Sequence, residues 1–439
     1  MLKNLIYIIT ILIVISANKA FALSSSSYLI ANKAITLYDF EKAYSHYFPT
    51  NLNFSELDSY NKLITLVNLQ LIDEANELAE DILKEDKLNQ SAWLVILTYA
   101  KLNNHTEAFN EYKKQSNKSL KEVIDFIYFE ENNTLKTNKL IARSIFEIVQ
   151  AAISKDQNQN NYNFLLFYLS IATILDNDFN EANYYTAYIY QTLKYYSKAE
   201  IFYKKIKANH KLYFDSQKYI AINKSKMGLF NDGEEKLLNL IKNSKKKDEL
   251  HLVLADLYRT NKNYSDAIEY YSKVISNKNN LEDDYWRIYY LRGICYERSN
   301  NWDLAEEDFL FSLDLNPSSP NVLNYLAYGW LERDKNIDLA LEMLIKAYNA
   351  NKDSFYILDS LAWAYYKKNQ FIKAAELMEE VIEMAPGEAI SLYHLADIYF
   401  AMKRKREAIF FWKQALDLAE PEDQISKDLL KKLEKHDSG

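Results

Sequence analysis

The sequence predicts an all-α protein, a right-handed α-α superhelix (solenoid) built from helix–turn–helix repeats. Three observations lead to this fold class. The stretch that begins at Phe355 matches the stretch that begins at Ala389 at a spacing of 34 residues, the length of one helix–turn–helix repeat. Small residues recur at fixed positions of these repeats. Glycine and proline are scarce, with six and five residues, which suits helices joined by short turns.

The repeats are cleanly phased from Asn180 onward. Their starts are 34 or 35 residues apart, with one spacing of 38. We assign the extra residues to a loop at 278–284 and a turn at 334–336, because insertions are tolerated in turns. The predicted repeats begin near Asn180, Phe214, Asp248, Trp286, Pro320, Phe355 and Ala389.

Small side chains at positions 8 and 20 of each repeat predict where its two helices touch, because helices approach closely only where side chains are small. Leucine in place of Ala362 or Ala374 should therefore overpack a helix pair. Position 8 holds Ala187, Ala221, Ala255, Gly293, Ala327, Ala362 and Ala396, and position 20 holds Ala199, Gly233, Ala267, Ala305, Ala340 (shifted by the one-residue insertion), Ala374 and Ala408.

The chain divides into four predicted segments. Residues 1–22 form a signal peptide, residues 23–179 hold degenerate helical repeats, and residues 180–422 hold seven well-phased repeats. Residues 423–439 form a capping helix and tail, because the end of a repeat array needs a helix with a polar outer face. On this helix we expect Leu429, Leu430 and Leu433 to face the last repeat.

The N-terminus has the pattern of a secretory signal. Lys3 precedes an apolar run from Leu5 to Ala17, and Ala20-Phe21-Ala22 provides a cleavage site before Leu23. The run is short for a membrane span, which needs about 20 apolar residues. An uncleaved membrane anchor is the alternative interpretation. No cysteine follows the small residues, so a lipoprotein signal is not supported. We expect an exported, periplasmic protein, associated with a membrane only if the signal is retained.

Charge and cysteine content restrict the partners and the redox chemistry. The formal charge is −8, and removing the two lysines of the signal makes it about −10. A mildly acidic surface argues against nucleic acid as a partner. Cys295 is the single cysteine, so no internal disulfide is expected. A buried, small apolar role for Cys295 is favoured over a reactive thiol.

The sequence shows no pattern of a catalytic or cofactor site. None of the six histidines lies in H-E-x-x-H or at metal-ligand spacing from a cysteine. Phosphate-binding glycine loops and the G-x-S-x-G nucleophile motif are absent as well. We therefore expect no enzyme activity, cofactor, metal or small-molecule substrate. An enzyme would need a polar pocket formed by residues far apart in the sequence.

The remaining signal is a binding groove. In a superhelix of helix pairs the first helices line the concave face, and positions 2, 5, 9 and 12 point into it. Large, rigid aromatic side chains at such positions are typical of interface hot spots. In the last three repeats these positions hold Asn321, Asn324, Tyr328, Leu331, Tyr356, Asp359, Trp363, Tyr366, Ile390, Tyr393, Asp397 and Phe400, and all but Asn321, Leu331 and Ile390 form the predicted protein-binding site.

Trp363 carries most weight in this site, because no core role is expected at its position. Two alternatives stay open: compositional bias placed the aromatic residues there, or a neighbouring helix covers them. The groove would take an extended chain or a partner helix, with Asn324 and Asp359 bonding to its backbone.

These residues carry a family resemblance. The mature chain resembles tetratricopeptide-repeat proteins, which share the pattern W-x2-L-G-x2-Y…A-x3-F…P. LNYLAYGW (323–330) and ILDSLAWAYY (357–366) resemble a group of exported proteobacterial members that act as adaptors for a carboxyl-terminal processing protease. Asp359, Ser360, Leu361 and Trp363 fall on that group's D-S-[LM]-[GA]-W signature. Some of its members are lipoproteins, and the missing lipobox cysteine is a departure from them.

The resemblance implies a non-enzymatic periplasmic scaffold or adaptor whose groove binds another protein, with a processing protease or its substrates as candidate partners. The alternative is a structural component of an envelope assembly complex, one that handles outer-membrane proteins or surface polysaccharide. The partner and the oligomeric state stay open.

Overall fold

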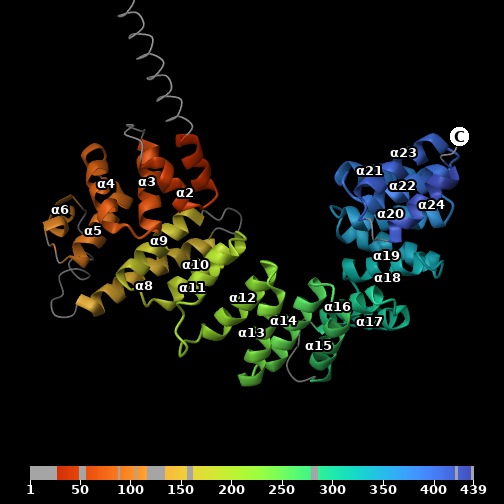
Figure 1. Ribbon diagram of the computed structural model, residues 1–439, viewed down its shortest axis with the longest axis horizontal. Helices are drawn as coiled ribbons and strands as arrows, with labels where there is room; N and C mark the ends of the chain where they lie inside the picture. Colours follow the sequence, from red (N-terminus) through yellow and green to blue (C-terminus); the bar gives the residue numbers. More distant parts are fainter. Residues whose placement is uncertain are drawn as a thin grey trace, which may run out of the picture. The chain divides into compact units, whose positions relative to one another are not determined.

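The computed structural model describes residues 27–48, 56–87, 89–103, 105, 107–115, 134–155, 162–277, 285–420 and 424–436. The predicted signal peptide at 1–22 and the predicted loop at 278–284 lie outside these residues. Every regular element of the described ranges is an α-helix (Figure 1). The predicted all-α fold class is confirmed.

The chain forms two compact units, residues 1–240 and 241–439. The N-terminal unit opens with a helix at 27–36. Its further helices are α2 (Phe40–Tyr47), α3 (Glu56–Asn68), α4 (Ile72–Glu85), α5 (Gln90–Leu102), α6 (Glu107–Gln115), α8 (Thr134–Lys155), α9 (Tyr162–Leu175), α10 (Asn180–Thr192), α11 (Tyr196–Tyr203) and α12 (Tyr213–Lys226). The boundary falls inside α13 (Phe230–Asn243).

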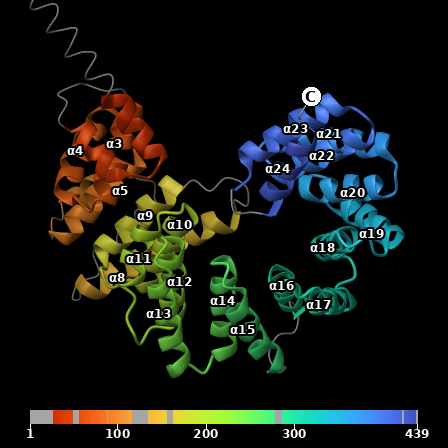
Figure 2. The same ribbon diagram turned by 45° about the vertical axis from the view of Figure 1, so that its right-hand side comes forward.

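The C-terminal unit carries the helices that matter for the site. Figure 2 shows α16 to α24 following one another in chain order. Its helices are α14 (Lys247–Thr260), α15 (Tyr264–Ser276), α16 (Tyr285–Arg298), α17 (Trp302–Leu315), α18 (Pro320–Leu331), α19 (Ile337–Ala350), α20 (Phe355–Lys367), α21 (Phe371–Met384), α22 (Ala389–Ala401), α23 (Lys405–Leu418) and α24 (Gln424–His436).

The helix starts follow the predicted phasing. The first helices of the predicted repeats are α10, α12, α14, α16, α18, α20 and α22, and each begins within one residue of the predicted repeat start. The reason is local, since the apolar and small positions that define the phase also fix which face of each helix is buried.

A left-handed residue ends the first helix of every one of these pairs. Position 15 always has a positive φ, and the next N–H donates to the carbonyl five residues back, as Gln370 does to Tyr365 at 2.9 Å. This closure satisfies a carbonyl at the helix end. Asn336 also has a positive φ (48°), where the sequence places a one-residue insertion. The position-15 residues are Lys194, Gly228, Lys262, Asn300, Asp334, Asn369 and Lys403.

Small side chains form the contact within each pair, as predicted. Every alanine at positions 8 and 20 of the seven repeats is fully buried. The first helices α10, α14, α16, α18, α20 and α22 each pack against their own second helix, and α20 also contacts α18 and α22. This second set of contacts places the first helices side by side along one face of the C-terminal unit.

The cap differs from the prediction at one residue. Leu429 on α24 is fully buried and Leu433 packs against the core, but Leu430 is 50% exposed. Leu429 and Leu433 are four residues apart and share one face of the helix, whereas the next residue turns away from it. The prediction that Leu430 faces the last repeat is therefore wrong.

In the N-terminal unit, α9 contacts two helices that lie far from it in the sequence. α9 packs against α3 and α5, and the Ser170 hydroxyl donates to Asn68 Oδ1 at 3.1 Å.

Over the ranges that the structure describes, none of the helices combines the length and the apolar content that crossing a membrane requires.

Candidate protein-binding groove

The first helices of the C-terminal unit enclose an open cavity of about 820 Å³. We call it the groove cavity. Most of its lining comes from α16, α18, α20 and α22. Four of the nine predicted site residues line it, namely Asn324, Tyr328, Tyr356 and Asp359, and the other five do not.

Tyr356 is the most accessible of the predicted residues. Its side chain is 42% exposed, and its hydroxyl donates to Oδ1 of Asn321, on the preceding repeat, at 3.1 Å. Tyr328 is half-buried beside it in the cavity wall, and burial raises the pKa of its hydroxyl. Tyr356 is therefore the aromatic residue best placed to meet a partner.

Asp359 and His394 form a buried pair across two repeats. His394 Nδ1 lies 2.8 Å from Asp359 Oδ1, and both side chains are almost fully buried. Burial lowers the pKa of His394, but the Asp359 carboxylate and its hydrogen bond, with Glu332 and Asp397 nearby, outweigh it. The net result is a pKa above the ordinary value for histidine. The pair therefore favours an imidazolium against a carboxylate.

Trp363 has a packing role that the repeat phasing did not predict. Its ring stacks between Tyr366, at 4.4 Å between centroids, and His394, at 4.1 Å. Its indole N–H donates to Glu332 Oε1 at 2.8 Å, and the side chain is only 6% exposed. The expectation that Trp363 lacks a core role is wrong, because two helices cover it. Its role in binding stays a prediction.

The last three predicted residues lie under the cap helix α24. Asp397 accepts from Trp412 Nε1 at 2.8 Å and from Lys432 of α24 at 2.5 Å. The Lys432 ammonium also lies 4.3 Å from the centre of the Tyr393 ring. Phe400 packs on Trp412, with 5.2 Å between ring centroids, and stays 37% exposed. This end of the row of first helices is therefore occupied by the chain's own cap.

Four buried polar atoms of residues that line the cavity have no hydrogen-bond partner among the described residues. They are the acceptors Asp359 Oδ2 and Asn324 Oδ1, the hydroxyl Ser391 Oγ and the donor Trp302 Nε1. Buried polar atoms in native structures are nearly always hydrogen-bonded, so each exception needs an explanation.

One wall of the groove cavity is a tryptophan seated on a glycine. A Cβ atom on Gly329 would lie 1.9 Å from the Trp302 ring, so only glycine admits this contact. The Arg333 guanidinium lies 4.0 Å from the centre of the same ring and donates to the Gly329 carbonyl at 2.9 Å. The sequence prediction missed four residues of the cavity lining, namely Trp302, Gly329, Arg333 and His394. For His394 a signal existed, since it lies 35 residues after Asp359, one repeat and one residue further on.

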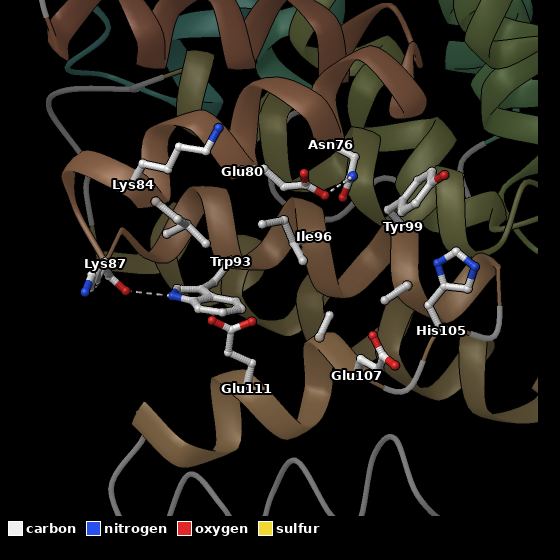
Figure 3. Close-up of a pocket in the computed structure, with 13 residues that line it drawn as sticks. Asn76, Glu80, Lys84, Lys87, Trp93, Ile96, Tyr99, His105, Glu107 and Glu111 are labelled. Atoms are coloured by element: carbon white, nitrogen blue, oxygen red, sulfur yellow. Dashed lines mark hydrogen bonds between the residues drawn. The ribbon is translucent and has the colours of Figure 1, made fainter.

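A second cavity, of about 930 Å³, lies in the N-terminal unit (Figure 3). Some of its polar side chains bond within the protein: Trp93 Nε1 donates to the Lys87 carbonyl at 2.8 Å, and Asn76 Nδ2 donates to Glu80 Oε1 at 2.9 Å. None of its described lining residues holds a buried polar atom without a partner. The groove cavity is therefore the stronger candidate.

Nothing in the described ranges points to metal chemistry or thiol chemistry. No group of three histidine, cysteine or carboxylate side chains there could hold a metal ion. Cys295 is fully buried, which confirms the predicted apolar role. Burial raises the pKa of its thiol to about 12.

The tetratricopeptide-repeat family model matches residues 220–282, 252–320 and 360–422. These matches fall in the cleanly phased part of the chain and include most of the groove lining. No curated protein matches the sequence.

Solved structures of helical-repeat proteins are similar to the chain. A tetratricopeptide repeat protein from Parabacteroides merdae shares 19% identity over 57% of this chain and 97% of its own, with a TM-score of 0.45. The Cut9–Hcn1 hetero-tetramer of the APC/C shares 15% identity over 93% of this chain and 83% of its own, with a TM-score of 0.46. YrrB, a tetratricopeptide-repeat protein with an unusual peptide-binding site, shares 18% identity over 45% of this chain and 99% of its own, with a TM-score of 0.34.

Proposed function

We propose that this chain, whose residues 220–320 and 360–422 are tetratricopeptide repeats, is a non-enzymatic scaffold or adaptor that binds an extended segment of another protein in the groove cavity. Proteins built from such repeats generally act in protein binding, because stacked helix pairs create long concave surfaces. The proposal follows that general role and assigns it to one face of the C-terminal unit.

The observation that carries the proposal is the combination of features in the groove cavity. It is open, it has an exposed tyrosine at its rim, and its floor holds buried polar atoms that the described residues leave unpaired. An extended peptide brings backbone and side-chain donors that a closed protein core does not offer. Aromatic side chains beside such polar groups give a peptide both contact area and orientation.

The proposal also includes the compartment in which the protein acts and the partner that it binds. The predicted signal peptide supports export to the periplasm. The run Asp359, Ser360, Leu361 and Trp363 supports a carboxyl-terminal processing protease, or one of its substrates, as the partner. A membrane contact would require the signal to be retained.

Affinity purification from the organism's own envelope extracts tests the proposal. The variant Tyr356→Ala/Ile390→Ala removes two exposed side chains of the groove cavity. The matched control, Ile372→Ala/Phe410→Ala, removes two exposed side chains from the second helices α21 and α23. We expect the groove variant alone to lose a partner that the wild-type protein retains. Identical partner lists for all three proteins would overturn the assignment of the groove.

One observation favours the alternative role in an envelope assembly complex. Every second helix from α17 to α23 exposes at least two large apolar side chains, which could serve a second, stable interface. That role predicts a large stoichiometric complex on gel filtration of extracts, which the adaptor role does not. The exposed residues are Leu304, Leu310, Phe311, Leu315, Leu339, Ile345, Ile372, Met384, Phe410 and Leu418.

A further inference from the structure

Among the unpaired atoms of the groove cavity are two acceptors on neighbouring repeats, besides the Ser391 hydroxyl and the Trp302 indole N–H. One carboxylate oxygen of Asp359 bonds His394, and the other, Oδ2, has no partner among the described residues. Asn324 Oδ1, one repeat earlier, is also unpaired there. Asp359 and Asn324 are only 5% and 6% exposed. Leaving such atoms unpaired is costly, so the floor is suited to a ligand that donates hydrogen bonds.

The charges around the groove cavity favour a cation. Five carboxylates line it, namely Asp359 and four glutamates, against two guanidinium groups and the imidazolium of His394. His394 pairs with Asp359, and the guanidinium groups of Arg298 and Arg333 are engaged as well. Arg333 lies on Trp302, and Arg298 pairs with Glu297 at 3.4 Å. A cavity with an excess of carboxylates attracts positively charged groups and repels negative ones. The four glutamates are Glu297, Glu332, Glu388 and Glu420.

Tyrosine rings line the same cavity. Cations are stabilised over the faces of tyrosine rings, especially where water is partly excluded. A cavity lined by both carboxylates and tyrosine rings is therefore suited to an ammonium or guanidinium group. The tyrosines of the lining are Tyr290, Tyr325, Tyr328 and Tyr356.

The chain itself shows the binding mode in the next repeat. There the ammonium of Lys432 reaches across from α24 to both oxygens of the buried Asp397. It lies 4.3 Å from the centre of the Tyr393 ring and 5.5 Å from that of Trp412. Around Asp359 the same kinds of group are present, but the groove lining has no lysine.

We propose that the groove cavity binds the side chain of an arginine or lysine in the partner's extended segment, which donates to Asp359 Oδ2 and Asn324 Oδ1. This inference rests on the proposed function and adds the chemical class of the bound segment. Arginine suits the site well, because its five N–H donors serve separated acceptors at once. An acidic segment is excluded by the same carboxylates.

A positional-scanning peptide library tests the inference. Immobilised nonapeptides have one fixed amino acid at the central position and mixtures elsewhere, and the full chain is applied to each pool. We expect the wild-type protein to prefer the arginine and lysine pools by about tenfold over the glutamine pool, since one charge-assisted contact is worth about that factor. A soluble arginine peptide and its neutral citrulline analogue, compared by fluorescence anisotropy, should show the same ratio.

Variants tie the preference to named groups. Asp359→Asn keeps an acceptor for His394 but removes the charge, and should abolish the preference. Glu332→Gln keeps an acceptor for the Trp363 indole N–H and should weaken the preference for basic residues. This second variant tests the inference even if Asp359→Asn fails to fold. The matched control is Glu306→Gln, because Glu306 accepts the Trp330 indole N–H at 2.5 Å in the same way but lies outside the groove lining.

The outcomes separate this inference from the proposed function. Binding of all pools without a basic preference, or a preference that survives in both Asp359→Asn and Glu332→Gln, overturns the inference and leaves peptide binding standing. No binding of any pool overturns both. A preference lost equally in Glu306→Gln would also contradict the assignment to Asp359.

Discussion

Asp359 and His394 lie on successive repeats and share one buried contact of 2.8 Å between Oδ1 and Nδ1. The pair fixes the relative position of α20 and α22, and Trp363 stacks on the same imidazole. These buried contacts therefore hold the proposed binding face rigid. The two oxygens of Asp359 differ, since one bonds His394 and the other is buried without a partner among the described residues.

The first prediction concerns pH. Because the pKa of His394 is raised in the folded chain, the stability from this pair is fully present below the ordinary histidine pKa of about 6.5. It is lost as the pH rises through the folded-state value. We expect the free energy of unfolding, measured by urea denaturation, to fall as the pH rises above about 6.5. His394→Leu should flatten this dependence.

The variant His394→Leu also measures how much the Asp359–His394 pair contributes to the free energy of unfolding. His394→Leu leaves a buried carboxylate unpaired and should cost about 3–5 kcal/mol near pH 6. The double variant Asp359→Asn/His394→Leu removes the charge as well and should recover part of that loss. A double variant as unstable as the sum of the single variants would argue against the ion pair.

The second prediction concerns Trp363. Trp363→Ala removes a buried, doubly stacked ring and should cost about 3–5 kcal/mol. Trp363→Phe keeps much of the stacking and loses one hydrogen bond, for about 1 kcal/mol, because the freed Glu332 carboxylate is exposed to water. Denaturant titrations of both variants measure the difference. Equal, small losses would mean that the ring is not part of the core.

The third prediction concerns the helix contacts. Ala362→Leu and Ala374→Leu should each cost about 1–3 kcal/mol, because both alanines are fully buried between paired helices and a larger side chain has no room. Ala350→Leu, at the exposed end of α19, is the matched control and should change little. Thermal melts of the three variants measure these changes. An unchanged melting temperature for both Ala362→Leu and Ala374→Leu would contradict the predicted repeat phase.

The fourth prediction concerns the thiol. Cys295 is fully buried and its pKa is raised to about 12, so the reactive thiolate is scarce at neutral pH. We expect a thiol reagent to label the denatured chain at one equivalent and the native chain far more slowly. Rapid labelling of the native protein would show that α16 opens readily.

The sequence was sufficient for the repeat architecture. The 34-residue spacing, the small residues at positions 8 and 20 and the apolar positions all repeat, so the phase could be read for helices such as α20 and α22. The insertion at 334–336 could be placed because the turn, not a helix, absorbs it. These features depend on contacts within a repeat, which a periodic pattern records.

The site was predicted less completely. Positions 2, 5, 9 and 12 brought Asn324, Tyr356 and Asp359 to one cavity, but Trp363 is stacked inside and Asp397 is covered by α24. These outcomes depend on contacts between repeats, such as Trp363 with His394, and on a cap that lies outside the periodicity. A repeat pattern indicates which face of a helix carries a side chain, but it does not indicate which residues of other repeats contact that side chain.

Photo-crosslinking in cells is the most direct test of partner binding in the groove. A photoreactive amino acid replaces Tyr356, at the rim of the groove cavity, or Ile372, which is 70% exposed on α21. The account predicts a specific crosslinked protein from position 356 and none from position 372. Crosslinks of equal strength from both positions, or from position 372 alone, would contradict it.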